Sequence, residues 1–273
     1  MNKQNKTIAS IPEISKTDIL VLCGGLGERL RSVIGNGQKV MATVSGQPFL
    51  DLLLRDLIHQ GCKRVILLTG YKAETIIDYY RKKKFPLSIE FSLELEPLGT
   101  GGAIKNAESL IKSNPFIVMN GDSFCSTNYQ EFLEYHARRQ AAGSIVVTKL
   151  ENRSDYGTIV LDEKNRIIDF QEKVKSDNLK QTPEAKSFTP PGRVKNSFYV
   201  NAGIYCFNKT ILAGMPKGKF SLEREFIPKS LAKEFYGFVI DQPLTDIGTP
   251  QRYEKAQTEL NNNFLDKKLP TNK

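Results

Sequence analysis

The sequence predicts an α/β fold with a Rossmann-like, doubly wound mixed sheet, and three observations support it. Short apolar runs alternate with longer segments of helical periodicity through the first half of the chain. These runs are continuous, as in strands that are buried on both faces of a parallel sheet. The 273 residues, 40% hydrophobic and 25% charged, have an ordinary globular composition. Repeated strand–helix–strand units then imply right-handed crossovers around one core.

The elements of the first half follow from local patterns. Residues 18–23 (DILVLC) form an apolar run closed by glycines, which predicts the first strand. Residues 49–60 place leucines at helical spacing and are followed by Gly61, which predicts a helix and its end. The same patterns predict strands at 64–69, 89–93 and 116–119 and helices at 73–83 and 101–112.

After residue 122 the regular alternation of apolar runs and helical segments ends. Two apolar runs flank residues 162–165 as in a β-hairpin, with strands at 157–161 and 166–170. Residues 174–196 contain three prolines and almost no apolar periodicity, which predicts a long mobile loop. Further strands are expected at 144–149, 197–207 and 236–240, and helices at 129–141, 221–235 and 251–263.

The charge distribution argues against a nucleic-acid-binding face. The formal net charge is +9, but residues 1–17 and 260–273 contribute +2 each and residues 174–196 contribute +3. The body of the chain is therefore nearly neutral, and the basic segments are better interpreted as solvated tails and a solvated loop. No run approaches the roughly 18 to 20 apolar residues that cross a bilayer, and residues 1–16 have no apolar signal segment. We expect a cytoplasmic protein without a membrane partner.

Cysteine and histidine usage argues against a zinc site or a disulfide framework. The four cysteines are far apart, and only two histidines, His59 and His136, are present. Each cysteine lies in or beside an apolar run, where a small buried thiol is the usual structure. We expect four reduced structural cysteines, at positions 23, 62, 125 and 206.

A glycine-rich turn follows the first predicted strand. Residues 22–30 read LCGGLGERL, and in open parallel sheets ligands bind beyond the carboxyl ends of the strands. Backbone amides at glycines can approach phosphate oxygens closely, and Arg29 adds a planar charged group. The turn is not a dinucleotide motif, because Leu30 occupies the third glycine position. It is not a P-loop either, because Lys39 is not followed by a hydroxyl residue.

Seven further short motifs follow this turn in a fixed order. Together they resemble the nucleotidyltransferases that make nucleoside-diphosphate sugars, from residue 18 to about residue 253. Within that family the chain is most similar to the D-glycero-D-manno-heptose 1-phosphate guanylyltransferases, through LRSVI, GQPFL and EPLGTGG. The motifs are Lys39, EPLGTGG (96–102), NGD (120–122), YG (156–157), FQEK (170–173), NAG (201–203) and DIGTP (246–250).

The resemblance implies a reaction in which a sugar 1-phosphate attacks the α-phosphorus of a nucleoside triphosphate and pyrophosphate leaves. The nucleophile is a phosphate monoester whose second pKa is about 6, so it is already ionised at neutral pH and needs no histidine base. A dianion must then approach a polyanion. Catalysis therefore depends on positioning and on positive charge.

The resemblance also assigns roles to residues. It implies that Asp122 and Asp246 bind Mg²⁺, whose preferred ligands are oxygens. The implied catalytic residues are Arg29, Lys39 and Lys173. The implied nucleotide-binding residues are Leu22, Gly24, Gly25, Gly27, Glu96, Gly101 and Asn120. The implied sugar-binding residues are Gly157, Glu172 and Asn201.

The implied organisation is one nucleotidyltransferase domain at 18–259 between a flexible N-terminal tail, 1–17, and a C-terminal tail, 260–273. Its nucleotide-binding half spans about 18–125 and its sugar-binding half about 126–259. The sequence contains no internal repeat, and we therefore expect one stand-alone domain and not a bifunctional protein. We hypothesise that residues 174–196, which separate two sugar-site positions, form a mobile lid whose basic residues attract phosphorylated substrate.

Two departures from the family pattern bear on the activity. Val40 stands where the family usually has proline, and Glu28 stands where threonine is frequent. A glutamate beside a triphosphate is unfavourable unless it points to solvent or to the metal.

Several alternatives stay open. GTP and D-glycero-D-manno-heptose 1-phosphate are the favoured substrates. A related enzyme using UTP or another triphosphate with a hexose or MurNAc phosphate would keep the same phosphate and metal residues. A non-catalytic nucleotide-sugar sensor is a second alternative, and nucleic-acid binding is the least supported. The sequence does not decide whether the chain forms a homo-oligomer.

Overall fold

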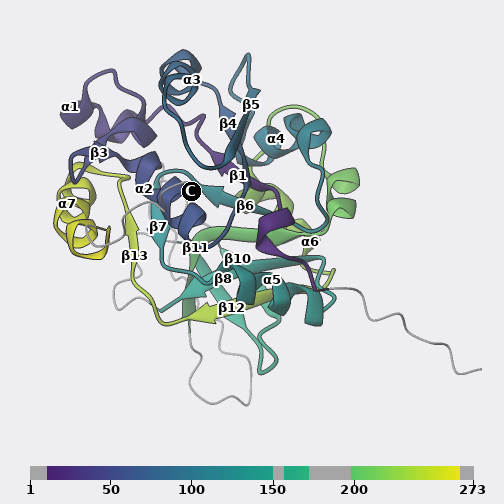
Figure 1. Cartoon of the computed structure of the whole chain (residues 1–273). Coiled ribbons are helices and arrows are strands. Elements are labelled where there is room, and N and C mark those ends of the chain that lie inside the picture. Colours follow the sequence, from purple (N-terminus) through teal and green to yellow (C-terminus); the bar gives the residue numbers. More distant parts are fainter. Residues whose placement is uncertain (1–10, 150–156, 172–197, 265–273) are drawn as a thin grey trace, which may run out of the picture.

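The computed structural model describes residues 11–149, 157–171 and 198–264, although not the side chains of residue 198 or residues 261–264 (Figure 1). The proposed lid at 174–196 lies outside the described residues. Within them, no helix has both the length and the hydrophobicity needed to cross a bilayer.

One mixed sheet forms the centre of the molecule. Its order is β10-β9-β11-β6-β1-β4-β5, while β8 also pairs with β11 and has β12 on its other side. β1 is parallel to β4 and β6, and β11 is antiparallel to β6. The strands are β1 (Ile19–Leu22), β4 (Arg64–Thr69), β5 (Ser88–Leu93), β6 (Phe116–Asn120), β8 (Gly143–Thr148), β9 (Thr158–Leu161), β10 (Ile167–Gln171), β11 (Phe198–Phe207) and β12 (Phe235–Ile240).

The strand order creates a switch point beside β1. From β1 the chain proceeds outward through β4 and β5, and then returns to the other side of β1 as β6. The connections after β1 and β6 therefore diverge, and open α/β sheets bind ligands in the crevice that forms there. A short strand pair, β7 (Ser123–Cys125) with β13 (Leu244–Asp246), follows β6 at this edge.

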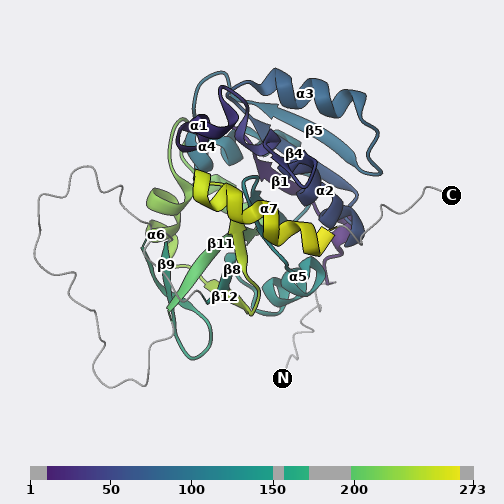
Figure 2. The ribbon, with the colours of Figure 1, turned by 90° about the vertical axis from the view of Figure 1, so that its left-hand side faces the viewer.

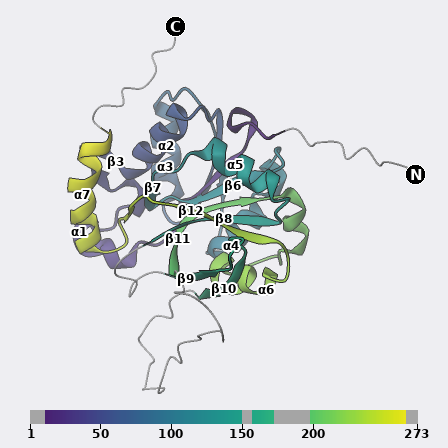
Figure 3. The ribbon, with the colours of Figure 1, turned by 90° about the horizontal axis from the view of Figure 1, so that it is seen from below.

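Helices cover both faces of the sheet, as the predicted doubly wound fold requires (Figures 1, 2 and 3). On β1, Ile19 and Val21 face one core cluster and Leu20 faces the other. The first cluster packs against α2 (Phe49–His59), α3 (Ala73–Lys82), α5 (Tyr129–Arg138) and α7 (Pro250–Phe264). The second packs against α4 (Gly99–Asn106) and α6 (Ile227–Ser230).

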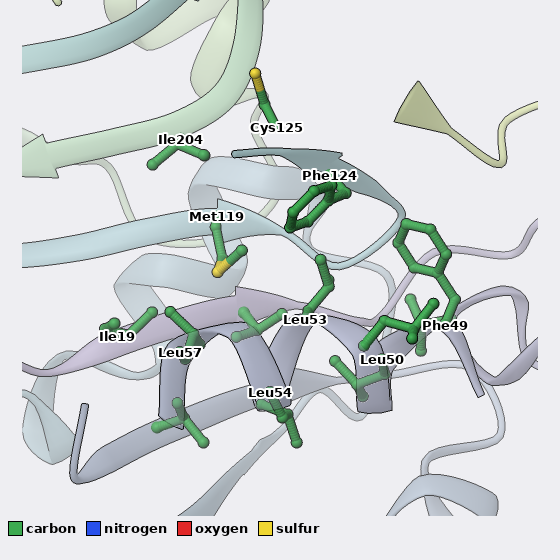
Figure 4. Packing of buried hydrophobic residues seen from close by; sticks show 14 of the residues in the cluster. Ile19, Phe49, Leu50, Leu53, Leu54, Leu57, Met119, Phe124, Cys125 and Ile204 are labelled. Carbon is green, nitrogen blue, oxygen red and sulfur yellow. The ribbon is translucent and has the colours of Figure 1, made fainter. Parts of the chain in front are cut away.

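Helix α2 confirms its sequence prediction. Figure 4 shows Leu53 and Leu57 pointing toward Phe124 and Met119 in the first cluster. Leu53 is 1% exposed and Leu57 is fully buried. Burying a leucine side chain contributes about 1.5 to 3 kcal/mol, so this face fixes the helix against the sheet.

The smaller elements complete the chain. A β-hairpin, β2 (Thr43–Val44) with β3 (Gln47–Pro48), leads into α2. Short helical turns lie at Ile14–Lys16, Glu28–Leu30, α1 (Arg31–Ile34), Lys39–Met41, Glu108–Leu110, Lys209–Gly214 and Leu222–Phe226.

Two predicted helices are wrong in extent. The helix expected at 101–112 is α4, which ends at Asn106 and is followed by a tighter turn, because the N–H of Ala107 is shared between two carbonyls at 3.2 Å each. The helix expected at 221–235 is a π-turn followed by the single turn of α6. Pro228 lies at the start of α6 and cannot donate to the preceding turn, and the carbonyl of Glu234 already pairs with the N–H of Ala142 at 2.8 Å.

The predicted tails are also too long. Ile14 is 7% exposed, and its N–H donates to Oε1 of Gln130 at 3.0 Å, so this part of the tail docks on α5. At the other end α7 continues past residue 259, and Leu260 is 1% exposed. Apolar side chains at these two positions draw both ends into the first core cluster.

Candidate active site

A cleft of about 440 Å³ opens at the switch point, where the carboxyl ends of β1 and β6 meet β11 and β13. We call it the main cleft. A neighbouring hollow of about 410 Å³, the side pocket, lies over the glycine-rich turn. The two share the lining residues Leu22, Gly25, Arg29, Lys39, Thr100, Asp122 and Gly248, so they form one continuous site.

The two expected metal ligands meet in the main cleft. Asp246 lies opposite Ser123 in the β7–β13 ladder, and the N–H of Ile247 donates to the carbonyl of Asp122 at 3.0 Å. Both aspartates line the cleft. This convergence was implied by resemblance and not by spacing, because residues 122 and 246 are far apart in the sequence.

Each of these carboxylates is paired with a cation. Lys39, on the turn Lys39–Met41, forms an ion pair with Oδ2 of Asp122. Arg252, in the first turn of α7, contacts both carboxylate oxygens of Asp246 at 3.2 and 3.3 Å. Asp246 also accepts the N–H of Gly248 at 2.7 Å. The main cleft therefore combines hard oxygen ligands with cations that can meet phosphate oxygens.

The two departures near the glycine-rich turn have structural explanations. Val40 is 3% exposed, and one of its methyl groups lies against Gly121, so an apolar side chain fits where the family has proline. Glu28 is exposed at the rim of the side pocket, where its charge stays solvated. Arg29 beside it lines both hollows.

Asn201 is brought to the main cleft by an irregularity in β11. The pairing of β11 with β8 shifts between Asn201 and Tyr205, and Gly203 has φ +74°. A Cβ at Gly203 would lie 2.6 Å from Nδ2 of Asn120, so only glycine allows β11 to approach the end of β6 here. Asn120 and Asn201 both line the cleft.

A hydrogen-bonded network that sequence reasoning missed continues from Asn201. Its Nδ2 donates to the hydroxyl of Tyr205 at 2.8 Å, and that hydroxyl donates to Oε1 of Glu223 at 3.1 Å. Thr100 and Ser221 donate to Oε2 of the same carboxylate at 2.6 and 3.2 Å. Three of these side chains, Tyr205, Ser221 and Glu223, lie outside the short motifs, so only the folded chain brings them to Asn201 and Thr100.

Glu94, and not Glu96, lies in the side pocket over the glycine-rich turn. Glu96 is exposed and lines neither hollow, whereas Glu94 lines the side pocket. Oε1 of Glu94 would lie 2.8 Å from a Cβ at Gly24, and its Oε2 accepts the N–H of Leu98 at 3.0 Å. Burial raises the pKa of Glu94, and the hydrogen bond from Leu98 offsets part of that rise.

Gly101 also has a role other than the expected one. It is buried and lines neither hollow. Its N–H donates to the carbonyl of Phe220 at 3.1 Å, and a Cβ would lie 2.0 Å from the Phe220 ring. This glycine is required by packing.

The other expected site residues divide into two groups. Gly157 lines the main cleft, and Gly24 and Gly27 line the side pocket. Glu172 and Lys173 lie outside the described residues. All four cysteines are buried and free of disulfides, as expected, and burial raises the pKa of Cys62 to about 11.

Comparison with known proteins identifies the family of the chain. The profile of the family described as nucleotidyl transferase matches residues 19–263. The chain is 36% identical over 245 residues to the D-glycero-alpha-D-manno-heptose 1-phosphate guanylyltransferase of Aneurinibacillus thermoaerophilus, covering 89% of this chain and 98% of that protein. It is 33% identical over 242 residues to the mannose-1-phosphate guanylyltransferase catalytic subunit beta of Drosophila melanogaster, covering 87% and 61%.

Solved structures show the same relationship. HddC from Yersinia pseudotuberculosis, crystallised in complex with GMP-PN, has a TM-score of 0.74 at 36% identity, over 89% of this chain and 99% of that one. A putative glucose-1-phosphate thymidylyltransferase from Bacillus anthracis has a TM-score of 0.71 at 16% identity, over 94% and 98%, and so shares the fold. The profile match and these relatives together place the chain in the nucleotidyl transferase family.

Proposed function

We propose that the chain transfers a guanylyl group from GTP to a sugar 1-phosphate, with D-glycero-D-manno-heptose 1-phosphate as the favoured acceptor. The observation that carries this proposal is the convergence of Asp122, Asp246, Lys39 and Arg29 on one cleft at the switch point of the sheet. The choice of a guanylyl group and of a heptose acceptor rests on the names of the relatives.

The reaction requires charge neutralisation more than proton transfer. An oxygen of the sugar phosphate forms a bond to the α-phosphorus of GTP, and the bond to the β-phosphate oxygen breaks, so pyrophosphate leaves with the electron pair. The attacking oxygen is already ionised at neutral pH. Arg29 and Lys39 would bind the triphosphate, and Lys173 is proposed for the sugar phosphate.

The residues present fit a Mg²⁺ ion. Asp122, in the turn between β6 and β7, and Asp246, in β13, place carboxylate oxygens in the same cleft. In the free protein each of them is paired with a cation, Lys39 or Arg252. Mg²⁺ uses one or two carboxylates and keeps water and phosphate as its other ligands, so two carboxylates suffice. When bound, it would neutralise phosphate charge as a Lewis acid.

The choice of guanine is proposed to depend on Glu94. An ionised carboxylate only accepts hydrogen bonds, and the Watson–Crick edge of guanine offers two adjacent N–H donors. Glu94 is half-buried in the side pocket beside Gly24, where a base would lie beyond the glycine-rich turn. Uracil and cytosine do not offer that pair of donors.

The sugar is proposed to bind in the main cleft beside the network of Asn201, Tyr205 and Glu223. These groups are both donors and acceptors, as recognition of several hydroxyls requires. Gly157 leaves room for the ring on the same side of the cleft.

Pyrophosphate release, measured with each of four nucleoside triphosphates against several sugar 1-phosphates, tests the proposal. We expect the highest kcat/KM with GTP and the heptose phosphate. Activity restricted to UTP and a hexose phosphate would reject both assignments. Binding without turnover for every pair would instead favour the sensor.

A further inference from the structure

The resemblance assigns no role to Arg252, although its side chain lines the main cleft. Arg252 belongs to α7, the last described helix, which contacts β13 (Figure 1). Its side chain is 20% exposed, and that of its partner Asp246 is 11% exposed. The pair is therefore partly shielded from solvent, and its charges interact more strongly than those of a surface pair.

The contact between Arg252 and Asp246 is long for a charged hydrogen bond. The two N···O distances are 3.2 and 3.3 Å, whereas charge-assisted bonds are usually about 2.7 to 2.9 Å. Asp246 is held independently by the N–H of Gly248 at 2.7 Å and by its place in β13. The carboxylate thus keeps its orientation without Arg252, and the guanidinium can be exchanged for another cation.

Arg252 and Arg29 converge on the same point. A Cβ built on Gly248 would lie 3.7 Å from Nη1 of Arg252 and 3.6 Å from Nη2 of Arg29. Two guanidinium groups this close repel each other unless anions lie near both. Asp246, whose Oδ1 would lie 2.7 Å from the same Cβ, supplies one negative charge for the two groups, and a substrate phosphate in the cleft would supply a second.

Other residues hold α7 in place. Gln257 donates to the carbonyl of Thr43 at 2.7 Å, and Thr245 donates to Glu259 at 2.9 Å. Ala256 and Leu260 are almost completely buried in the first core cluster. The helix therefore has attachments to the fold besides the pair of Arg252 with Asp246.

We propose that Arg252 is a phosphate-binding residue that is paired with Asp246 in the free protein and is displaced when a divalent cation binds that carboxylate. The displaced guanidinium then stays in the main cleft, beside Arg29, as a ligand for substrate phosphate. This inference rests on the proposed function, since it assumes that Asp246 is a metal ligand. Arg252 thus competes with the metal for the Asp246 carboxylate before the reaction, and it binds substrate phosphate during the reaction.

Titration with Mn²⁺, used as a probe for Mg²⁺ and followed by the EPR signal of the free ion, tests the proposal without nucleotide or turnover. We expect R252Q to bind Mn²⁺ about threefold to tenfold more tightly than the parent protein, because the competing cation is gone. R252K has a shorter side chain that cannot span both oxygens as the guanidinium does, so its affinity should be intermediate. K255Q removes the same charge from an exposed position of α7 and should match the parent.

Activity gives the second readout. R252Q should lower kcat/KM for the sugar 1-phosphate about tenfold or more, while K255Q leaves it unchanged. Tighter metal binding together with slower turnover is the combination that a purely structural role would not produce. Unchanged or weaker Mn²⁺ binding by R252Q would overturn the proposal, and if R252Q did not fold, the same result with R252K would do so.

D246N separates this inference from the proposed function. If Asp246 is a metal ligand, D246N should weaken Mn²⁺ binding at least about tenfold. Parent-like binding by D246N would reject the metal site itself. Weak binding by D246N with parent-like binding by R252Q would keep the metal site and reject the role of Arg252.

Discussion

The carbonyl oxygen of Asp122 accepts a hydrogen bond from the N–H of Ile247 at 3.0 Å. This main-chain contact holds the segment that carries Asp122 next to the segment that carries Asp246. It extends the β7–β13 ladder by one step beyond Asp246. The side chains of residues 122 and 246 therefore reach the same cleft because of strand pairing, which a change to either side chain leaves intact.

Replacing either aspartate should remove activity while preserving the fold. D122N and D246N keep the size of the side chain and the main-chain ladder but lose a carboxylate charge. We expect kcat to fall at least about a hundredfold, with the melting temperature within a few degrees of the parent. Initial rates and thermal unfolding measure both effects. D78N, at an exposed position of α3, is the matched control and should be fully active.

Glu94 and Glu96 give a paired test of base recognition. E94Q replaces an acceptor with a group that also donates, so kcat/KM for GTP should fall about tenfold to a hundredfold, with little change for other triphosphates. E96Q changes an exposed side chain outside both hollows and should behave like the parent. Equal losses for both variants would contradict the role of Glu94.

Alanine substitutions at Gly203 and Gly46 distinguish two costs of adding a Cβ, which are backbone strain at positive φ and steric clash with a neighbouring residue. Both have positive φ, +74° and +77°, but a Cβ meets Asn120 only at Gly203. G46A should cost about 1 kcal/mol in unfolding free energy. G203A should cost about 1 to 3 kcal/mol more and should also lower kcat/KM, since it displaces Asn120 and Asn201. Denaturant unfolding and rate measurements on both variants decide this.

His136 should make stability depend on pH in mild acid. The ring is 1% exposed, its Nδ1 lies 2.9 Å from the hydroxyl of Ser144, and burial lowers its pKa to about 4. Because the unfolded chain binds a proton near pH 6.5 and the folded chain does not, stability is constant above pH 6.5 and falls between pH 6.5 and 4. At pH 5 the loss attributable to this ring is about 2 kcal/mol.

Unfolding free energies measured from pH 7.5 to pH 5 test the role of His136. H136Q should abolish this part of the pH dependence. H59Q, at an exposed histidine on α2, should keep it. A parent-like pH profile in H136Q would show that other groups are responsible.

Much of the fold was predictable because apolar periodicity determines it. The strand at 18–23 and the helix at 49–60 are recovered nearly to the residue as β1 and α2. The failures occur where local pattern competes with tertiary contacts. The helix expected at 101–112 ends early at Asn106, and the one expected at 221–235 is interrupted near Pro228.

The candidate site was predictable where a residue follows a strand directly. Leu22 and Asn120 are the last residues of β1 and β6, and Asp122 lies two residues beyond β6, so the sheet places all three at the cleft. Glu94 and Glu96 are not distinguishable in this way. β5 ends at Leu93 and the chain then turns, so that one carboxylate stays against the glycine-rich turn and the other meets solvent.

Residues recruited from distant segments could not be predicted. Arg252 follows a turn motif at the start of a helix, where an arginine is unremarkable in sequence. Tyr205 and Glu223 belong to an apolar strand and a short π-turn that are distant in sequence, and their hydrogen bond exists only in the folded chain. Such contacts depend on tertiary packing between segments that are distant in sequence, and local sequence patterns carry no information about that packing.

Strand β11 has a consequence for making hybrid enzymes. Its later residues pair with β6, and its earlier residues pair with β9. A graft that exchanged residues 126–259 for those of a relative with another acceptor would therefore cut through a shared hydrogen-bonded ladder. Transplanting acceptor preference should succeed when the donor's β11 is compatible with this chain's Asn120 and β6, and should otherwise yield insoluble protein.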